Sequence, residues 1–472
     1  MSLRSRAVLA VALTIGFYAL ALGLIAVLVR IMFIPNVPGR VLIFCLLGAG
    51  AIAVSIIPRP TRFTPPGPRL NPAGQARLFA ELNSVARAVG EAMPEEVYIT
   101  PEMNAGVFQR GRRRVMVLGL PLMQIMTVPQ MRAVLAHEFG HYQGGDTKLG
   151  PLIYRMRETI ERTLNTLSGQ AALLGLLFLA YGRMFMRVTQ AVSRRQELAA
   201  DELAARTVGA RPMIEGLRAL ARGSLAFDVY WRSEVVPLLE AGFQPPLADG
   251  FARFLAEPGV MNQIAQAAEQ ELAKPRRDAY DSHPPDAERI AALSALPSGP
   301  DGEDPAAAVT LLEGLEAIEP WILIGVVKPG VQLRRVSWAE TGNAALIPGW
   351  RERVRRQAHL IGGYTVGWLP ELLKYADRIG QAEAGAARQS VPADRARALG
   401  VGFAGAAFAN ALAQNGWTTE SLPGRPPVMR RGEAALEPFS EVTKLARGEV
   451  DADTWQRRCW DLGIRDLSLM PA

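Results

Sequence analysis

Residues 133–146 read AVLAHEFGHYQGGD and contain two of the four histidines in a chain of 472 residues. His137 and His141 are four residues apart, so on a helix both imidazoles project from one face. Thr127 can cap such a helix at its start, and Gln130 follows three residues later, as in a capping box. The stretch therefore predicts one helix that carries two potential metal ligands side by side.

Two imidazole nitrogens in this arrangement can bind one ion at about 2.0–2.1 Å, the distance that zinc prefers. Glu138 follows the first histidine and can take a proton from a water molecule without binding the metal itself. A His-Glu-x-x-His pattern on a helix is for this reason a signature of zinc hydrolases. The other interpretation is a pair of surface histidines near a helix C-terminus, where positive charge is favoured.

A catalytic zinc site needs a third protein ligand and keeps one position open for water. The chain has two cysteines, Cys45 and Cys459, too few for a thiolate cluster, so the third ligand must be His, Glu or Asp. Residues 193–210, SRRQELAADELAARTVGA, predict a helix on which Glu197 and Asp201 face the same way. Glu197 would complete the ligand set, and Asp201 would orient a ligand histidine. Taken alone, two such acids are more often solvated surface charges.

The N-terminal part of the chain is strongly apolar. Residues 7–29 carry no charge and would form a helix roughly 35 Å long, and residues 41–57 would form a second one of roughly 26 Å. A cleaved signal peptide is the alternative for the first run, but its apolar part exceeds the usual length of about 7–15 residues and a second run follows. We expect residues 1–63 to form a transmembrane helical hairpin.

Arginines at the ends of these runs predict the orientation, because positive residues near a membrane tend to stay in the cytoplasm. Five arginines flank the outer ends of the two runs: Arg4, Arg6, Arg59, Arg62 and Arg69. Two arginines, Arg30 and Arg40, lie in the connecting loop. We therefore expect a multi-pass protein of the cell inner membrane whose catalytic domain faces the cytoplasm. The net charge of +7 suits anionic lipid, and no interleaved aromatic and basic pattern indicates nucleic acid.

Three motifs, HEFGH, SRRQELAAD and SHPPDAERI, follow one another at residues 137–141, 193–201 and 282–290. Together they resemble the HtpX-type membrane zinc metalloendopeptidases, a family that also holds the type I CAAX prenyl proteases. The similarity runs from about residue 95 to residue 293. It implies an α+β zincin-type metalloprotease domain, mainly helical with a small sheet, with one Zn²⁺ ion per chain and a polypeptide substrate.

The resemblance also implies roles for single residues. It makes His137, His141 and Glu197 the zinc ligands and Glu138 the catalytic base. It places Asp201 and Arg289 behind the ligands, and it places His283 beside the transition state. It further implies an edge strand at Asn104 and Ala105 that pairs with an extended peptide. Without the family, His283 would more simply cap a helix.

The remaining sequence predicts the domain organisation. Residues 95–100, 106–109 and 113–118 look like strands, the last two joined as a hairpin, and 64–73 is a Pro-rich linker expected to stay extended. The peptidase domain is predicted at 74–295. A Pro-, Gly- and acid-rich linker at 294–308 separates it from an accessory region at 309–472.

Residues 400–405, GVGFAG, have the glycine spacing of a dinucleotide-binding fingerprint, but no strand is predicted before them. They therefore predict close helix packing.

An apolar insert at about 164–188 separates the second motif from the first. Family members usually thread two further spans here, but the run at 171–181 is too short for two. A single crossing is excluded because both motifs must meet at one ion. An interfacial or re-entrant helix fits this length, as does a helix packed against the anchor, and a soluble core helix is the alternative.

These observations predict a membrane-anchored zinc endopeptidase that hydrolyses misfolded or misassembled proteins. A narrow processing protease of the CAAX type is the second enzymatic interpretation, although the few apolar runs argue against a large intramembrane chamber. A membrane scaffold with structural zinc is the alternative from another class of function. The sequence does not indicate an oligomeric state.

Overall fold

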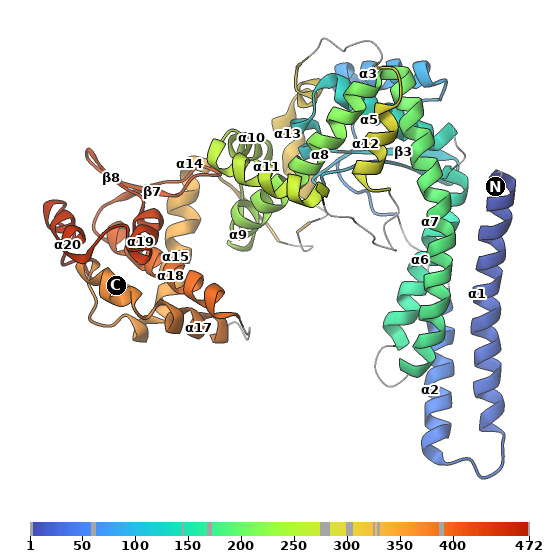
Figure 1. Ribbon diagram of the computed structural model, residues 1–472, viewed down its shortest axis with the longest axis horizontal. Coiled ribbons are helices and arrows are strands. Elements are labelled where there is room, and N and C mark those ends of the chain that lie inside the picture. Colours follow the sequence, from blue (N-terminus) through green and yellow to red (C-terminus); the bar gives the residue numbers. More distant parts are fainter. Residues whose placement is uncertain are drawn as a thin grey trace. The chain divides into compact units, whose positions relative to one another are not determined.

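The computed structural model forms two compact units. Unit 1 comprises Met1–Ser224 and Ala267–Gly325, and unit 2 comprises Leu225–Gln266 and Val326–Ala472. Figure 1 traces the chain through both. The structure describes residues 3–57, 63–143, 146–167, 172–273, 284–298, 305–323, 326–327, 331–386 and 391–470.

The first two helices of unit 1 are long and apolar enough to cross a membrane. They are α1 (Leu3–Met32) and α2 (Gly39–Ile56), which pack side by side with Phe17 and Ile52 fully buried. Many outward side chains of both helices are apolar and exposed, among them Ile15 and Ile43. Such a surface is costly in water and suits lipid. A third helix of sufficient length and composition, α18, is two-thirds buried within unit 2.

The apolar insert belongs to a second helical hairpin, made of α6 (Asp146–Leu167) and α7 (Ala172–Val208). In Figure 1 these two helices run side by side, and α7 continues unbroken from the hairpin into the peptidase body. The Phe178 ring lies 5.6 Å from that of Phe17, and the Tyr181 hydroxyl donates to the carbonyl of Leu13 at 2.5 Å. The apolar run thus lies in a helix packed against the anchor, and not in a separate soluble core.

A three-stranded sheet lies in the peptidase body, as predicted. Its strands are β1 (Glu96–Thr100), β2 (Ala105–Arg110) and β3 (Arg113–Gly119), in the order β1-β3-β2. β1 and β3 are parallel, whereas β2 and β3 form an antiparallel hairpin in which Arg110 pairs with Arg113. Gly111 in the turn has a φ of +62°, a conformation that glycine adopts without strain. The predicted hairpin is confirmed.

The Pro-rich linker predicted at 64–73 is largely extended as far as residue 70 but ends in a 3₁₀ turn at Pro72–Gly74, and it is not free. Residues 63–70, which we name the strap, run along β1, where Leu70 N–H donates to Val97 O at 2.8 Å and Ile99 N–H donates to Pro68 O at 3.1 Å. A Cβ at Gly67 would lie 2.0 Å from Ile99 O, so only glycine fits there. The strap covers the outer edge of β1, and β2 is the open edge of this sheet, since no other strand pairs with it among the residues that the structure describes.

A buried carboxylate on β1, that of Glu96, binds two arginines of the β2–β3 hairpin, and one of these arginines also contacts the strap. Glu96 accepts hydrogen bonds from Arg113 at 2.9 Å, from Tyr98 at 2.8 Å and from Arg110 at 2.6 Å. These bonds outweigh the effect of burial and lower the pKa of Glu96 to about 2. The guanidinium of Arg110 also stacks 4.2 Å above the ring of Phe63, the first residue of the strap.

Unit 1 contains further helices, of which α4 and α5 contact the sheet. They are α3 (Ala76–Val89), α4 (Leu120–Ile125), α5 (Val128–Gln143), α12 (Asp286–Ser294) and α13 (Leu315–Ile322). The end of the predicted linker also belongs to unit 1, where Val128 N–H donates to Ala306 O and Ala308 N–H donates to Met126 O. These bonds hold the chain against the start of α5. Two helices, α8 (Ala210–Tyr230) and α11 (Pro258–Ala273), continue from one unit into the other.

Unit 2 is built around α18 (Ala393–Gln414), whose Phe403 and Phe408 are fully buried. It also contains a two-stranded sheet of β4 (Phe243–Gln244) and β5 (Arg334–Arg335) and a three-stranded sheet of β6 (Thr418–Glu420), β7 (Val428–Arg431) and β8 (Ala434–Leu436). Its remaining α-helices are α9 (Val236–Glu240), α10 (Leu247–Leu255), α14 (Trp338–Thr341), α15 (Ile347–Arg356), α16 (Leu369–Leu373), α17 (Ala376–Ala386), α19 (Pro438–Ala446) and α20 (Ala452–Asp461).

The glycines that resemble a dinucleotide fingerprint lie inside α18. A Cβ at Gly400 would be 1.9 Å from Ala376 O on α17, and a Cβ at Gly380 would be 1.7 Å from Ala396 O. The two helices therefore touch backbone to backbone, and the prediction of close helix packing is confirmed.

Gly400→Ala is expected to lower the free energy of unfolding of unit 2 by about 1–3 kcal/mol, because the added methyl meets backbone that cannot move aside. Gly402→Ala is the matched control, since the nearest atoms to a Cβ there are the guanidinium nitrogens of Arg353 at 3.7 and 3.8 Å. It should be neutral, or stabilising by up to about 1 kcal/mol through helix propensity. Thermal unfolding followed by tryptophan fluorescence measures both, and equal melting temperatures would contradict the packing argument.

Candidate metal centre

The centre forms where α5 crosses α7. α5 starts with the predicted capping box, in which Thr127 N–H donates to Gln130 Oε1 at 3.0 Å and Gln130 N–H donates to Thr127 Oγ1 at 3.4 Å. Gly140 allows the close crossing, because a Cβ there would lie 3.2 Å from the Cα of Ala200 on α7. The close approach of Gly140 to Ala200 therefore brings the second half of α7 directly over the two histidines.

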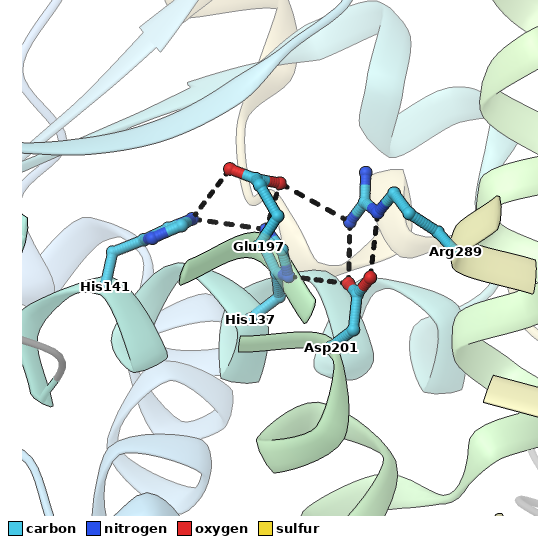
Figure 2. A network of polar contacts seen from close by, with 5 residues as sticks. All are labelled: His137, His141, Glu197, Asp201 and Arg289. Carbon is cyan, nitrogen blue, oxygen red and sulfur yellow. Dashed lines mark hydrogen bonds and ion pairs between the residues drawn. The ribbon is translucent and has the colours of Figure 1, made fainter. Parts of the chain in front are cut away.

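Three potential ligands converge at this crossing, as Figure 2 shows. The Nε2 atoms of His137 and His141 are 3.2 Å apart, and each lies 3.6 Å from an oxygen of Glu197. Ligands held at about 2.0–2.1 Å from zinc in a tetrahedral arrangement are about 3.3 Å from one another. The two distances of 3.6 Å end on different oxygens of Glu197, and the three side chains together lie close enough to bind one zinc ion.

Asp201 lies behind His137, with its Oδ1 at 2.9 Å from the Nδ1 of that histidine. A carboxylate accepts only, so the Nδ1 carries the proton and the Nε2 presents its lone pair to the other two donors. Arg289 on α12 holds the same carboxylate through two hydrogen bonds, of 2.8 and 2.7 Å. Electron-rich atoms from three side chains thus face one another at short range, an arrangement that favours a cation between them.

Burial raises the pKa of Asp201, but hydrogen bonds from Arg289 and His137 and the positive charge of Arg289 outweigh it and lower the pKa to about 2. Burial lowers the pKa of Arg289, and its bonds to Asp201 more than reverse this, so its pKa is raised. Both groups are charged at neutral pH. Arg289 also lies 3.9 Å from Glu197 and offsets part of the cost of burying that carboxylate.

The structure brings together five of the nine residues that the sequence selected: His137, His141, Glu197, Asp201 and Arg289. Glu138 lies on α5 beside the first histidine and is partly buried. Ala105 begins the open edge strand β2, which contacts α5, and the exposed Asn104 precedes it and accepts the N–H of Gly119 at 2.7 Å. His283 lies outside the described residues.

Sequence reasoning missed two features around the centre. Gly140 permits the close crossing of α5 and α7. In the sequence, this crossing is indicated only by the presence of a small residue between the two histidines. The strap that leaves β2 as the open edge reads as an ordinary Pro-rich linker, and its signal was Gly67 within a run of prolines.

Two histidines on one helix with a glutamate from a second helix define a candidate metallopeptidase site. The model of peptidase family M48 matches residues 72–296. One curated relative, Protease HtpX of Idiomarina loihiensis, is 30% identical over 206 residues, which are 39% of this chain and 72% of the relative. The Protease HtpX homolog of Chlorobium limicola is 28% identical over 285 residues, 54% of this chain and 86% of the relative. No solved structure matches.

The chain therefore belongs to peptidase family M48, as an HtpX-like metalloprotease. The family resemblance seen in the three motifs is confirmed, and the apolar helices α1 and α2 agree with a membrane protein.

Asp201→Asn is expected to weaken zinc binding about 10–100-fold, because the neutral amide no longer fixes the proton on the Nδ1 of His137. Competition with a chromophoric chelator measures the affinity. Glu202→Gln, the next residue on α7, is the matched control, since the side chain of Glu202 is about half exposed and forms an ion pair with Arg206. Equal zinc affinity of the two variants, with circular dichroism showing both folded, would exclude this role for Asp201.

Proposed function

We propose that the chain is a zinc-dependent endopeptidase that cleaves unfolded or misassembled proteins from a zincin-type domain anchored in the membrane. The observation that carries this proposal is the convergence of His137, His141 and Glu197 within the spacing of one ion, with Glu138 on the same helix. A structural metal would use four protein ligands. Among the described residues, no further His, Cys, Asp or Glu joins the three donors.

The donor set supports zinc. Two imidazoles and one carboxylate are the ligands of many catalytic zinc sites, and both cysteines lie elsewhere, Cys45 in α2 and Cys459 in α20. A bound zinc ion would supply Lewis-acid chemistry, lowering the pKa of water towards ~7 and polarising the scissile carbonyl.

The residues of the chain would act around this centre as follows. Glu138 takes the proton of the attacking water and passes it to the leaving amine. Asp201 and Arg289 keep His137 in one tautomer and one orientation. The open edge of β2 pairs with the substrate backbone, which orients the scissile bond.

Pairing with β2 supports the substrate class. An edge strand accepts only a chain that can extend and offer its backbone N–H and C=O groups, and a folded protein keeps most of these groups paired. Unfolded or misassembled proteins offer them freely. The arginine distribution around the spans favours a multi-pass protein of the inner membrane with the catalytic domain in the cytoplasm.

Glu138→Gln is expected to slow cleavage of an unfolded protein by about 10²–10⁴-fold while zinc stays bound, because the variant loses its proton acceptor and keeps all three donors. The measurement compares the two purified full-length chains in detergent, each verified by metal analysis. Glu202→Gln is the matched control and should keep full activity.

Chelation of zinc should abolish the activity of the unmodified chain, and added zinc should restore it. Undiminished cleavage by Glu138→Gln, once contaminating proteases have been excluded, would contradict the assignment of the base. Cleavage that survives chelation would contradict the role of the metal.

A further inference from the structure

The helix α7 connects the anchor to the candidate metal centre without a break. Its 37 residues include the apolar part that packs on α1 and the part that carries Glu197 and Asp201. An α-helix rises 1.5 Å per residue and resists bending, so it holds these two parts at a constant separation. The height of Glu197 above the bilayer can therefore be obtained from the sequence positions along α7.

The outward stripe of α7 marks where the apolar layer ends. Leu176 and Leu177 are 58% and 49% exposed, and the same side of the helix then presents Arg183 and Arg187. Arginines at such a position lie at headgroup level. On the inward side, Tyr181 bonds to Leu13, which lies within the uncharged run of α1 at 7–29, so α7 is still inside the apolar layer at Tyr181. The boundary thus falls close to Arg183.

Glu197 lies 14 residues beyond Arg183 on the same helix, which corresponds to about 21 Å along the axis. A tilt of about 20°, common for membrane helices, would shorten this height only to about 20 Å. An extended chain advances about 3.3–3.6 Å per residue, so about six residues are needed to cover the distance.

A second connection, from α2 to the strap, limits the distance between the edge strand and the anchor. Six peptide steps connect Ile57 at the end of α2 to Phe63, so these two residues are at most about 22 Å apart whatever path the chain takes. The ring of Phe63 lies 6.4 Å from that of Phe108 on β2, and the guanidinium of Arg110 stacks on it. The open edge strand is therefore tied to the anchor independently of α7.

We infer that the fixed height of this centre sets a minimum distance of about six extended residues between the membrane-spanning segment of a substrate and the bond that is cut. The inference rests on the proposed function. It assigns to the enzyme a class of membrane-protein substrate, those with an unfolded segment of at least this length beside a span. Bonds closer to the bilayer are spared because they cannot reach the centre.

The test uses the full chain reconstituted in vesicles of phosphatidylcholine and phosphatidylglycerol. Substrates carry one spanning helix, a Gly-Ser linker and a sequence that the full chain cuts in an unfolded soluble protein. The scissile bond is placed 2, 4, 8 or 12 residues from the span. Eight extended residues reach about 26 Å and four reach about 13 Å, so the substrates with 8 and 12 should be cut at least tenfold faster than those with 2 and 4.

Helical linkers are the matched control, because they cover only about 1.5 Å per residue. An eight-residue helical linker reaches about 12 Å and should be cut at least tenfold more slowly than the flexible linker of equal length, and a sixteen-residue one should restore cleavage. Equal rates at all spacings, or equal rates for both eight-residue linkers, would overturn the inference. Failure to cut the soluble peptide that contains the same bond would instead refute the proposed protease function.

Discussion

The contact of Asp201 with His137 and Arg289 is the interaction on which the candidate centre depends. Three buried groups from α5, α7 and α12 meet there, and each is satisfied by the others. Removing one partner from such a cluster would leave an uncompensated buried charge, which costs several kcal/mol, on the order of 3–5. The same contact sets the tautomer of His137, so the packing of three helices and the direction of one lone pair are determined together.

The second determining feature is the continuity of α7. Its N-terminal part shares a core with the anchor, where Phe178 and Phe185 pack with Phe17 and Ile52, and its C-terminal part supplies a ligand. Because one continuous helix carries both parts, the contact with α1 and the ligand Glu197 stay at a fixed separation along α7. The strap adds a second connection and, by covering β1, decides which edge of the sheet stays open.

Local sequence predicted much of this structure. Spacing alone placed His137 and His141 on one helix face and Glu197 with Asp201 on another, and the strand pattern with Gly111 predicted the hairpin. The crossing of α5 and α7 was beyond local reasoning, because it depends on Gly140 meeting Ala200, 60 positions later. Family resemblance supplied Arg289, whose partner lies 88 residues away.

Docking of the strap on β1 was not predicted, because a segment rich in proline and glycine has the same composition whether it is exposed to solvent or hydrogen-bonded to a strand. The extent of unit 2 was not predictable either. Residues 225–266 pack with the C-terminal region although they lie within the family match, and no change in composition marks them. The apolar run at 171–181 was compatible with an interfacial or re-entrant helix, a helix packed against the anchor and a soluble core helix, and its length and composition alone do not select among them.

X-ray absorption spectroscopy of the purified full-length chain tests the central claim most directly, since it reports the metal, its ligands and their distances together. The account predicts one zinc ion per chain with two imidazole nitrogens and oxygen ligands at about 2.0–2.2 Å. Sulfur at about 2.3 Å, or a chain that binds no zinc at neutral pH, would contradict it.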